Sequence, residues 1–182
     1  MDEVGRGALA GPLVACAVIL NNQIPIPKLN DSKKLNKKHR EEIFQEIIVS
    51  GAEIVIEEIS VRLINSKGIG WANKEIFKRL IRKIDAHKYI IDGNFKINIK
   101  GKNIKSVIKA DSSRKCVMAA SIVAKVTRDR LMQNLHTRYP DYGWERNVGY
   151  GTRLHIEAIR KYGEVRYHRT VFVTTAINNY KI

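Results

Sequence analysis

Two acidic residues and an arginine lie within the first seven positions of this sequence. Asp2 and Glu3 are adjacent, and the triplet Gly5-Arg6-Gly7 follows them. Carboxylate oxygens are preferred ligands of hard divalent cations, whereas a guanidinium group matches the geometry of a phosphate. Glycine lets the chain turn sharply, so both kinds of group can face one point. The stretch therefore favours metal-assisted chemistry on a phosphate ester, and its alternative is a solvated acidic pair beside a glycine hairpin.

Two further acidic residues occupy the ends of expected elements. A short apolar strand ends on Asp92, and Asp111 precedes a long apolar helix, whose dipole favours an anion at that end. Ligands of open α/β sheets gather at strand ends, so we expect both acids to join Asp2 and Glu3 in one pocket. Taken singly, each has an alternative, since Asp-Gly is a common turn pair and aspartate is a good helix N-cap.

Four carboxylates brought close together would repel one another, and their pKa values would rise. Divalent cations remove this conflict. Two ions about 3.5–4 Å apart can serve phosphodiester hydrolysis, one activating water and the other stabilising the leaving oxygen. Oxygen ligands favour Mg²⁺ or Mn²⁺ over Zn²⁺. No histidine has a partner at the spacing of a nucleophile and its base, which leaves metal-activated water as the expected nucleophile.

The elements that must position these residues alternate between strands and helices. Strands are expected around Asp2 and over residues 13–20, 52–59 and 88–94, with a weaker extended stretch over 95–108. Helices are expected over residues 36–50, from Ser60 to the glycines at 68 and 70, over 71–84, from Ser112 or Ser113 to 136, and over 152–163. Asn36, Ser60 and Thr152 supply N-caps. Residues 141–151 are expected to form a polar loop, and 164–182 a basic tail. The alternation predicts an α/β fold with a mixed sheet and flanking helices.

The chain of 182 residues is strongly basic, with 33 Lys and Arg against 18 Asp and Glu and a net charge of +15. Such a charge attracts polyanions, so nucleic acid is the expected partner, with compositional drift as the alternative. Cys16 and Cys116 lie in apolar stretches and are expected to be buried thiols in a reducing compartment. No apolar run reaches membrane length and no signal peptide is visible. We expect a cytoplasmic monomer.

Several motifs occur in a fixed order along nearly the whole chain. They are residues 2–7 (DEVGRG), 9–12 (LAGP), 31–35 (DSKKL), 91–94 (IDGN), 109–112 (KADS), 119–129 (AASIVAKVTRD), 149–152 (GYGT) and 168–169 (HR). In these motifs the chain resembles ribonuclease HII, the type 2 ribonuclease H. The related ribonuclease HIII carries Gly-Thr-Gly in place of Gly-Arg-Gly and has an additional N-terminal domain, so Arg6 and the short length favour the type HII family.

The resemblance implies a ribonuclease-H-like catalytic core over residues 1–138 and a small helical C-terminal part over 139–182, packed as one unit. It implies an endonuclease that cleaves RNA in RNA/DNA hybrids and at ribonucleotides embedded in duplex DNA, as in ribonucleotide excision. The cut falls 5′ of the ribonucleotide and leaves a 3′-hydroxyl and a 5′-phosphate. Mg²⁺ or Mn²⁺ would be the cofactor.

The resemblance also implies roles for individual residues. The catalytic and metal-binding set would be Asp2, Glu3, Asp92 and Asp111. The substrate-binding set would be Gly5, Arg6, Gly7, Lys33 and Tyr150. The glycine-arginine loop would contact the backbone and the 2′-hydroxyl, the feature that separates RNA from DNA. Tyr150 would stack on the following sugar, and Lys33 would hold phosphate, although either side chain can also be merely exposed. Ser121 and Asp129 are expected to support packing or to hold the residues that bind the ligand, and His168 to be a structural or phosphate-side contact.

The sequence departs from the family pattern at its start. Family members usually carry an apolar strand segment before the Asp-Glu pair, whereas only Met1 precedes Asp2 here. Either the true start lies upstream or the chain is a shortened form, in which case Asp2 is expected on a fraying terminus. The alternative to an enzyme is a truncated, non-catalytic module that binds nucleic acid through its positive charge.

Overall fold

A three-stranded antiparallel sheet lies at the centre of the molecule. The computed structural model describes residues 1–20, 26, 29, 32 and 35–180. The strands are β1 (Asp2–Val4), β2 (Leu13–Ile19) and β3 (Glu53–Ile59), in the order β1-β2-β3. β2 is buried on both faces, as its continuous apolar run predicts. The hairpin between β1 and β2 pairs Glu3 with Ala15, and the loop at its tip contains the glycine-arginine triplet.

A second pair of strands, β4 (Tyr89–Asp92) and β5 (Ile104–Val107), runs in parallel. The backbone of Met1 connects this pair to β1. Its nitrogen donates to the carbonyl of Ile90 at 2.8 Å, and the N–H of Asp92 donates to the carbonyl of Met1 at 3.0 Å. Met1 is 6% exposed and its backbone is hydrogen-bonded, so the fraying that a shortened form would give Asp2 is not seen in this structure. The same two bonds set the end of β4 beside Asp2.

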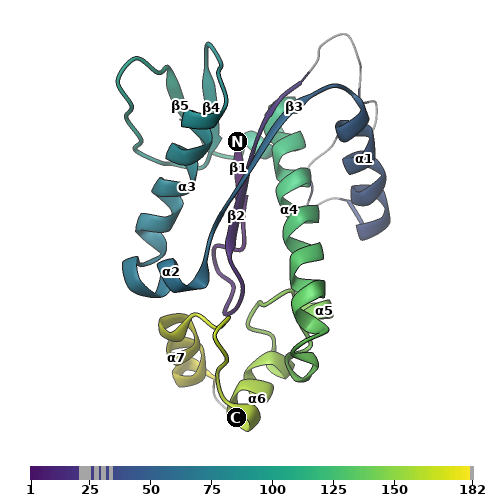
Figure 1. Cartoon of the computed structure of the whole chain (residues 1–182), viewed down its shortest axis with the longest axis vertical. Helices are drawn as coiled ribbons and strands as arrows, with labels where there is room; N and C mark the ends of the chain where they lie inside the picture. Colours follow the sequence, from purple (N-terminus) through teal and green to yellow (C-terminus); the bar gives the residue numbers. More distant parts are fainter. Residues whose placement is uncertain (21–25, 27–28, 30–31, 33–34, 181–182) are drawn as a thin grey trace.

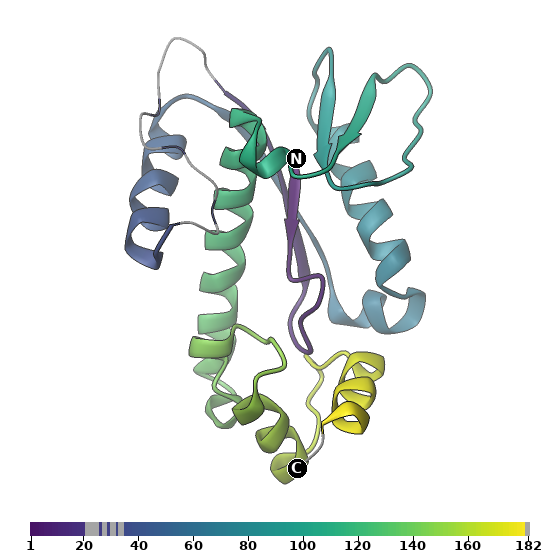
Figure 2. The ribbon, with the colours of Figure 1, turned by 180° about the vertical axis from the view of Figure 1, so that it is seen from behind.

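Helices cover both faces of the central sheet (Figures 1 and 2). One face carries α1 (Lys37–Val49) and α4 (Lys115–His136), and the other carries α2 (Val61–Lys67) and α3 (Ile69–Lys83). α3 buries an apolar stripe that includes Ile76, Phe77 and Leu80 against the sheet. The small, apolar first half of α4 is buried, as the sequence predicts. The expected α/β fold is therefore confirmed.

The C-terminal part is helical and lies at one end of the molecule (Figure 1). It contains the 3₁₀ turn η2 (Pro140–Tyr142), α5 (Trp144–Asn147), α6 (Arg153–Tyr162) and α7 (Thr170–Asn179). Trp144 is fully buried there, and the cluster around it extends to Leu9 and Ala10 of the loop after β1 and to Met132 of α4. The C-terminal part therefore packs directly against the loop at the tip of the β1–β2 hairpin.

Three helix caps predicted from the sequence are confirmed. Asn36 caps α1, Ser60 caps α2 and Thr152 caps α6, in each case by accepting from the backbone N–H three residues later. These side chains satisfy donors that the first helical turn leaves unpaired.

Four expectations about helices are wrong, the first being the polar loop over 141–151, which contains α5. The basic tail over 164–182 contains α7, whose β-branched sequence has low helix propensity and whose Val173 is buried against the C-terminal cluster. Ser112 and Ser113 do not start the long helix, because Ser112 belongs to the 3₁₀ turn η1 (Ala110–Ser112) and both hydroxyls donate to the carbonyl of Lys109. Gly70 does not interrupt a helix, because it lies in the first turn of α3.

Candidate active site

One pocket of about 360 Å³ brings together most of the predicted site residues. It is lined by residues 2–7 and by Ser32, Arg40, Asp92, Ser121, Lys125 and Tyr150. Asp111 is buried on η1 and is not among the described residues that line the pocket. Lys33 lies outside the described residues. The structure therefore gathers three of the four predicted acids, the whole Gly5–Gly7 loop and Tyr150.

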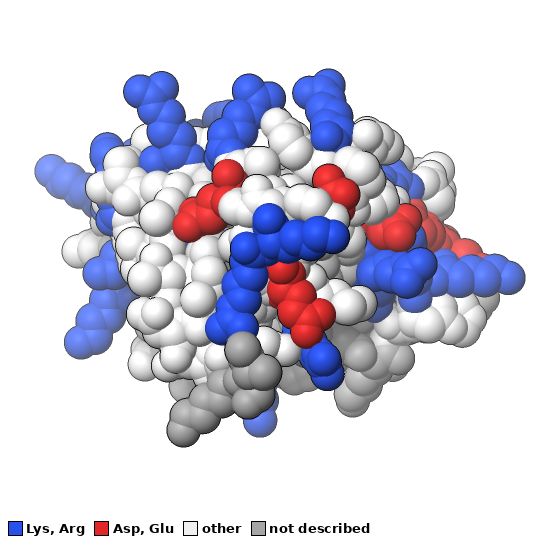
Figure 3. Space-filling model, turned by 90° about the horizontal axis from the view of Figure 1, so that it is seen from below, with Lys and Arg blue, Asp and Glu red and all other residues white. Residues whose placement is uncertain are grey.

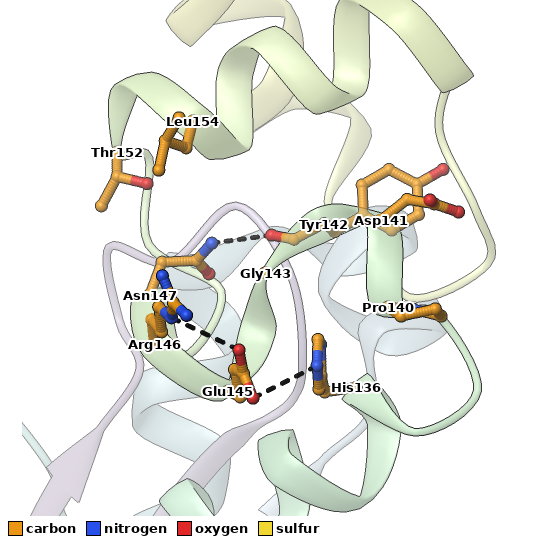
Figure 4. Close-up of a pocket in the computed structure, with 10 residues that line it drawn as sticks. All are labelled: His136, Pro140, Asp141, Tyr142, Gly143, Glu145, Arg146, Asn147, Thr152 and Leu154. Carbon is orange, nitrogen blue, oxygen red and sulfur yellow. Dashed lines mark hydrogen bonds and ion pairs between the residues drawn. The ribbon is translucent and has the colours of Figure 1, made fainter.

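A larger pocket of about 450 Å³ lies in the C-terminal part, away from these acids (Figure 4). Its walls come from the end of α4, from η2, from α5 and from the start of α6. Glu145 within it is paired with His136 at 3.4 Å and with Arg146 at 3.3 Å. Because that carboxylate is already paired with Arg146 and contacts His136, this pocket lacks the converging acids that the smaller one has.

The three acids of the smaller pocket come from two elements. Asp2 and Glu3 lie on β1, and Asp92 lies at the end of β4. One oxygen of Asp2 accepts from the N–H of Glu3 at 2.9 Å. Asp92 Oδ1 accepts from the N–H of Ala110 at 2.7 Å, which ties the end of β4 to η1. Asp111 directly follows Ala110, so this bond also fixes the turn that carries the fourth acid.

A line of hydroxyl groups supports Asp2 from the side of α4. Ser121 Oγ is 2.8 Å from Ser32 Oγ, and Ser121 also hydrogen-bonds the carboxylate of Asp2. Arg40 donates to the carbonyls of Ser32 and Leu35 and so holds the segment that contains Ser32. Of the two roles expected for Ser121, these contacts favour support of a site residue, because Ser121 connects the acidic strand to the facing helix.

Burial and repulsion from neighbouring carboxylates shift Asp2 and Glu3 toward their neutral forms. Burial raises the pKa of Asp2 to about 6, with the hydrogen bond from Ser121 opposing this and Asp92 adding to it. Burial and then Asp2 raise the pKa of Glu3 to about 8, although Arg6 acts in the opposite direction. The protein thus holds carboxyl groups close together at a cost to their ionised forms, and a bound cation would relieve this cost.

The acids fit a divalent metal ion by their chemistry. Asp2, Glu3 and Asp92 offer only oxygen atoms, the ligand type of Mg²⁺ and Mn²⁺. Among the described residues, however, no three or more acidic, histidine or cysteine side chains form a preassembled metal-binding cluster. The donor set is therefore suitable in its chemistry.

The two glycines of the triplet meet different constraints. Gly5 has φ +90°, and a Cβ there would lie 2.2 Å from Nε of Arg128, so the fold itself requires glycine. A Cβ on Gly7 would meet no atom within 4 Å. The space beside Gly7 is open to the pocket, and close approach of another molecule is a reason for glycine there.

Two buried arginines that the sequence interpretation did not single out hold this loop. Arg169 donates through Nη1 to the carbonyls of Gly5 at 2.7 Å and Arg6 at 3.1 Å, and through Nε and Nη2 to the carbonyl of Gly11. Arg128 donates to the carbonyls of Pro12, Ala10 and Val148. Both side chains are fully buried. Arg128 stands four residues from Met132 and from Ala124 on the buried side of α4, and this spacing is a signal that could have identified it.

Arg128 also connects the loop to Tyr150. Its guanidinium carbon lies 5.5 Å from the centroid of the Tyr150 ring, within the range of a cation–π contact. The carbonyl of Gly149 accepts from the N–H groups of Leu9 at 2.7 Å and Ala10 at 3.1 Å. The segment with Tyr150 and the loop after β1 are therefore directly hydrogen-bonded.

Basic side chains line the pocket and also lie at the C-terminal end of the molecule. Within the pocket, Arg6 is exposed, whereas Lys125 is paired with Asp129 at 2.5 Å. At the end of the molecule formed by α6 and α7, Lys and Arg side chains project around the rim with acidic side chains between them (Figure 3). Some are paired locally, such as Arg153 with Glu157 at 2.8 Å.

The helices of the described residues include none with the length and apolar character of a membrane-spanning segment.

This mixed α/β fold, with acids at strand ends beside a glycine-arginine loop, defines a ribonuclease-H-like nuclease. The family model described as Ribonuclease HII matches residues 1–175. The protein named Ribonuclease HII from Wolbachia sp. subsp. Brugia malayi (strain TRS) is 46% identical over 175 residues, covering 94% of this chain and 85% of that protein. The chain belongs to the ribonuclease HII family. It is accordingly a ribonuclease H endonuclease, a metal-dependent hydrolase.

Solved structures agree with the family assignment. The chain is similar to one in the PCNA:RNase HII complex from Archaeoglobus fulgidus, with 27% identity, a TM-score of 0.81 and coverage of 92% of this chain and 91% of that chain. It also shares its fold with Bst-RNase HIII in complex with Mn²⁺, with 21% identity, a TM-score of 0.68 and coverage of 98% and 69%.

Proposed function

We propose that this protein cleaves the RNA strand of RNA/DNA hybrids and cuts DNA duplexes at embedded ribonucleotides. Cleavage falls 5′ of the ribonucleotide and leaves a 3′-hydroxyl and a 5′-phosphate. The observation that carries the proposal is that Asp2, Glu3 and Asp92 line the same pocket as the Gly5–Gly7 loop and Tyr150. Groups suited to hydrolysis and groups suited to recognition of a sugar therefore face one substrate.

The acids are proposed to hold divalent cations, Mg²⁺ or Mn²⁺. Asp2 and Glu3 approach from β1 and Asp92 from β4, and Asp111 follows the residue that hydrogen-bonds Asp92. Two bound cations would supply an activated water and stabilise the leaving oxygen of the phosphodiester. Cation binding favours the ionised forms of Asp2 and Glu3, whose pKa values the metal-free pocket raises.

The loop and the tyrosine are proposed to recognise the ribonucleotide. The open space beside Gly7 admits a sugar-phosphate backbone close to the main chain, where the 2′-hydroxyl can be hydrogen-bonded. Arg6 is exposed at the pocket and suits a phosphate. Tyr150 presents a ring on which the following sugar can stack. Lys33 stays a proposed phosphate contact, and the protein is proposed to act as a cytoplasmic monomer.

The test is incision of a DNA duplex that contains one ribonucleotide, with Mn²⁺ or Mg²⁺, beside the same duplex made entirely of DNA. We expect a single cut 5′ of the ribonucleotide and an intact control duplex. Mass spectrometry of the fragments would identify the 3′-hydroxyl and 5′-phosphate ends. Salt-sensitive binding of both duplexes without incision by folded, metal-supplied protein would contradict the proposal and indicate a binding module instead.

A further inference from the structure

A chain of hydrogen bonds runs through two buried histidines to the main chain of Tyr150. The N–H of Val165 lies 2.9 Å from Nδ1 of His168, and Nε2 of His168 lies 3.2 Å from Nε2 of His155. Nδ1 of His155 then lies 2.9 Å from the carbonyl oxygen of Tyr150. His155 is fully buried and His168 is 2% exposed. A buried polar chain of this kind is rigid when every member is satisfied.

The partners fix the direction of each bond. A backbone N–H only donates, so Nδ1 of His168 accepts and the ring hydrogen is on its Nε2. A carbonyl only accepts, so Nδ1 of His155 carries the hydrogen of that ring and its Nε2 accepts. Trp144 Nε1, which can only donate, reaches this same Nε2 at 3.0 Å, so the hydrogens of Trp144 and His168 share its one lone pair. Both rings are therefore neutral, and all the donated hydrogens point along the chain toward Tyr150.

The surroundings favour the neutral rings. Burial and the nearby His155 lower the pKa of His168 to about 4, and burial lowers the pKa of His155. Aromatic rings enclose the pair, with the ring centroid of His168 4.8 Å from that of Tyr142 and 5.4 Å from that of Trp144. The pair is thus held by packing as well as by hydrogen bonds.

The residue after His168 reaches the other recognition segment. Arg169 donates to the carbonyls of Gly5 and Arg6, as described above. The main chain here is paired too, because the N–H of Arg169 donates to the carbonyl of Leu9 at 2.7 Å. Two consecutive side chains therefore contact the two parts of the molecule that face the proposed substrate, one through His155 and one directly.

We propose that His168 and Arg169 are positioning residues, which set the distance between the Gly5–Gly7 loop and Tyr150 and thereby the preference for an RNA-to-DNA junction. This inference rests on the proposed function, in which the loop and the tyrosine contact one ribonucleotide and its neighbour. Neither residue lines the pocket among the described residues, so each acts through the segment that it holds. The substrate class is a duplex in which a ribonucleotide is followed by a deoxyribonucleotide.

Two substitutions of His168 separate the positioning role from packing. In His168→Gln the amide nitrogen can take the place of Nε2 and donate to His155, so the connection to Tyr150 is kept. In His168→Asn the amide oxygen can take the place of Nδ1 and accept from Val165, but nothing reaches His155. Both variants leave a small polar residue in the same cavity. Exposed His87→Asn is the matched control.

The expected results differ between binding and turnover. We expect His168→Asn to raise KM for a duplex with one ribonucleotide about fivefold, the effect of one neutral hydrogen bond, with little change in kcat. His168→Gln should stay within about twofold of the unchanged protein, and so should His87→Asn. The ratio of junction cleavage to cleavage within a long hybrid should fall in His168→Asn alone. Thermal melting establishes that each variant is folded.

A double-mutant cycle with Tyr150→Ala tests whether the effect passes through the tyrosine. If His168 acts by positioning Tyr150, His168→Asn should change KM little once the ring is removed. Equal KM and equal junction preference for the folded Asn, Gln and unchanged proteins would overturn the inference.

Duplex affinity measured in an Asp92→Asn background keeps this test independent of turnover. An unchanged protein that fails to incise defeats the proposed function. In that case equal affinities of the two His168 variants for the ribonucleotide duplex would overturn the positioning role as well. A loss of duplex affinity in the Asn variant alone would support the positioning role.

Discussion

The acidic pocket and the histidine pair both bury polar groups, but they do so in opposite ways. In the pocket, Asp2 is buried and Glu3 is partly buried near Asp92, and burial together with repulsion from neighbouring carboxylates raises the pKa values of Asp2 and Glu3. Around His155 and His168, each ring nitrogen meets a partner of the right kind. Buried charge without compensation is costly, whereas a satisfied neutral network is rigid. The first region is therefore suited to a ligand that brings positive charge, and the second to holding neighbouring segments still.

Burial favours the neutral forms of the carboxyl groups in the pocket and of the two imidazole rings, but the consequence for function differs between the two regions. A protonated carboxyl is a poor ligand for a cation, so the metal-free pocket is not in its working state. The hydrogen-bond chain requires neutral imidazoles, so the histidine pair is already in its working state. Addition of a divalent cation should consequently change the ionisation of the pocket and leave the histidines unchanged.

The largest effect is expected from Asp92→Asn. The variant keeps an oxygen that can accept from the N–H of Ala110, so the fold should persist, but it removes a negative ligand from the pocket. We expect incision to fall roughly a thousandfold, the equivalent of several kcal/mol of lost charge stabilisation, with duplex binding retained. Asp85→Asn, at an exposed carboxylate paired with Lys102, is the matched control and should cut normally. Unchanged turnover of Asp92→Asn would remove Asp92 from the proposed catalytic set.

Gly5→Ala and Gly7→Ala test whether each glycine of the loop is required for the fold or for binding of the duplex. A methyl group on Gly5 collides with the buried Arg128 and strains a backbone at φ +90°, so the variant should lose about 3 kcal/mol of stability. The methyl group on Gly7 has open space, so that variant should fold normally and bind the ribonucleotide duplex less tightly. Chemical denaturation and duplex titration measure the two effects. A stable Gly5→Ala protein would show that the Arg128 contact does not constrain the loop.

Glu3→Gln addresses the pH response of the metal-free pocket. The folded pKa of Glu3, about 8, exceeds its ordinary value, so the folded protein binds more protons than the unfolded chain between about pH 4.5 and 8. The stabilising contribution is complete below this window and is lost as the pH rises through it. The free energy of unfolding of Glu3→Gln, measured relative to that of the unchanged protein, should increase by about 2 kcal/mol from pH 5 to pH 8, after allowance for screening by solvent.

Melting temperatures with and without Mn²⁺ check this prediction. At pH 8 the ion should stabilise the unchanged protein more than Glu3→Gln, because the ion compensates the charge that the variant lacks. Parallel pH profiles of the two proteins without metal would show that Glu3 titrates normally.

The sequence predicts the acidic pocket better than the network that supports it. Asp2, Glu3 and Asp92 stand at strand ends that apolar patterns reveal, and acidic residues there have a recognisable chemistry. The role of Arg128 or His155 depends on which carbonyl lies nearby in three dimensions, and no local pattern records that. The β-branched segment of α7 is helical only because of tertiary packing. The assignment of Asp111 and Lys33 and the division of the chain at residue 138 stay predictions.

The smallest effect is expected from acid on the histidine pair, and its sign is opposite to that of Glu3. The pKa of His168 in the folded protein, about 4, is below its ordinary value, so the unfolded chain takes up a proton first as the pH falls. The stability that depends on the neutral ring is complete above about pH 6.5 and is lost as the pH falls toward 4. His168→Gln should therefore be less stable than the unchanged protein at pH 7, and the difference should shrink by about 1 kcal/mol near pH 4.5. Denaturant titrations at the two pH values measure this difference. A constant gap would mean that His168 carries no proton-linked stability, and the contrast between the two regions would then rest on the pocket alone.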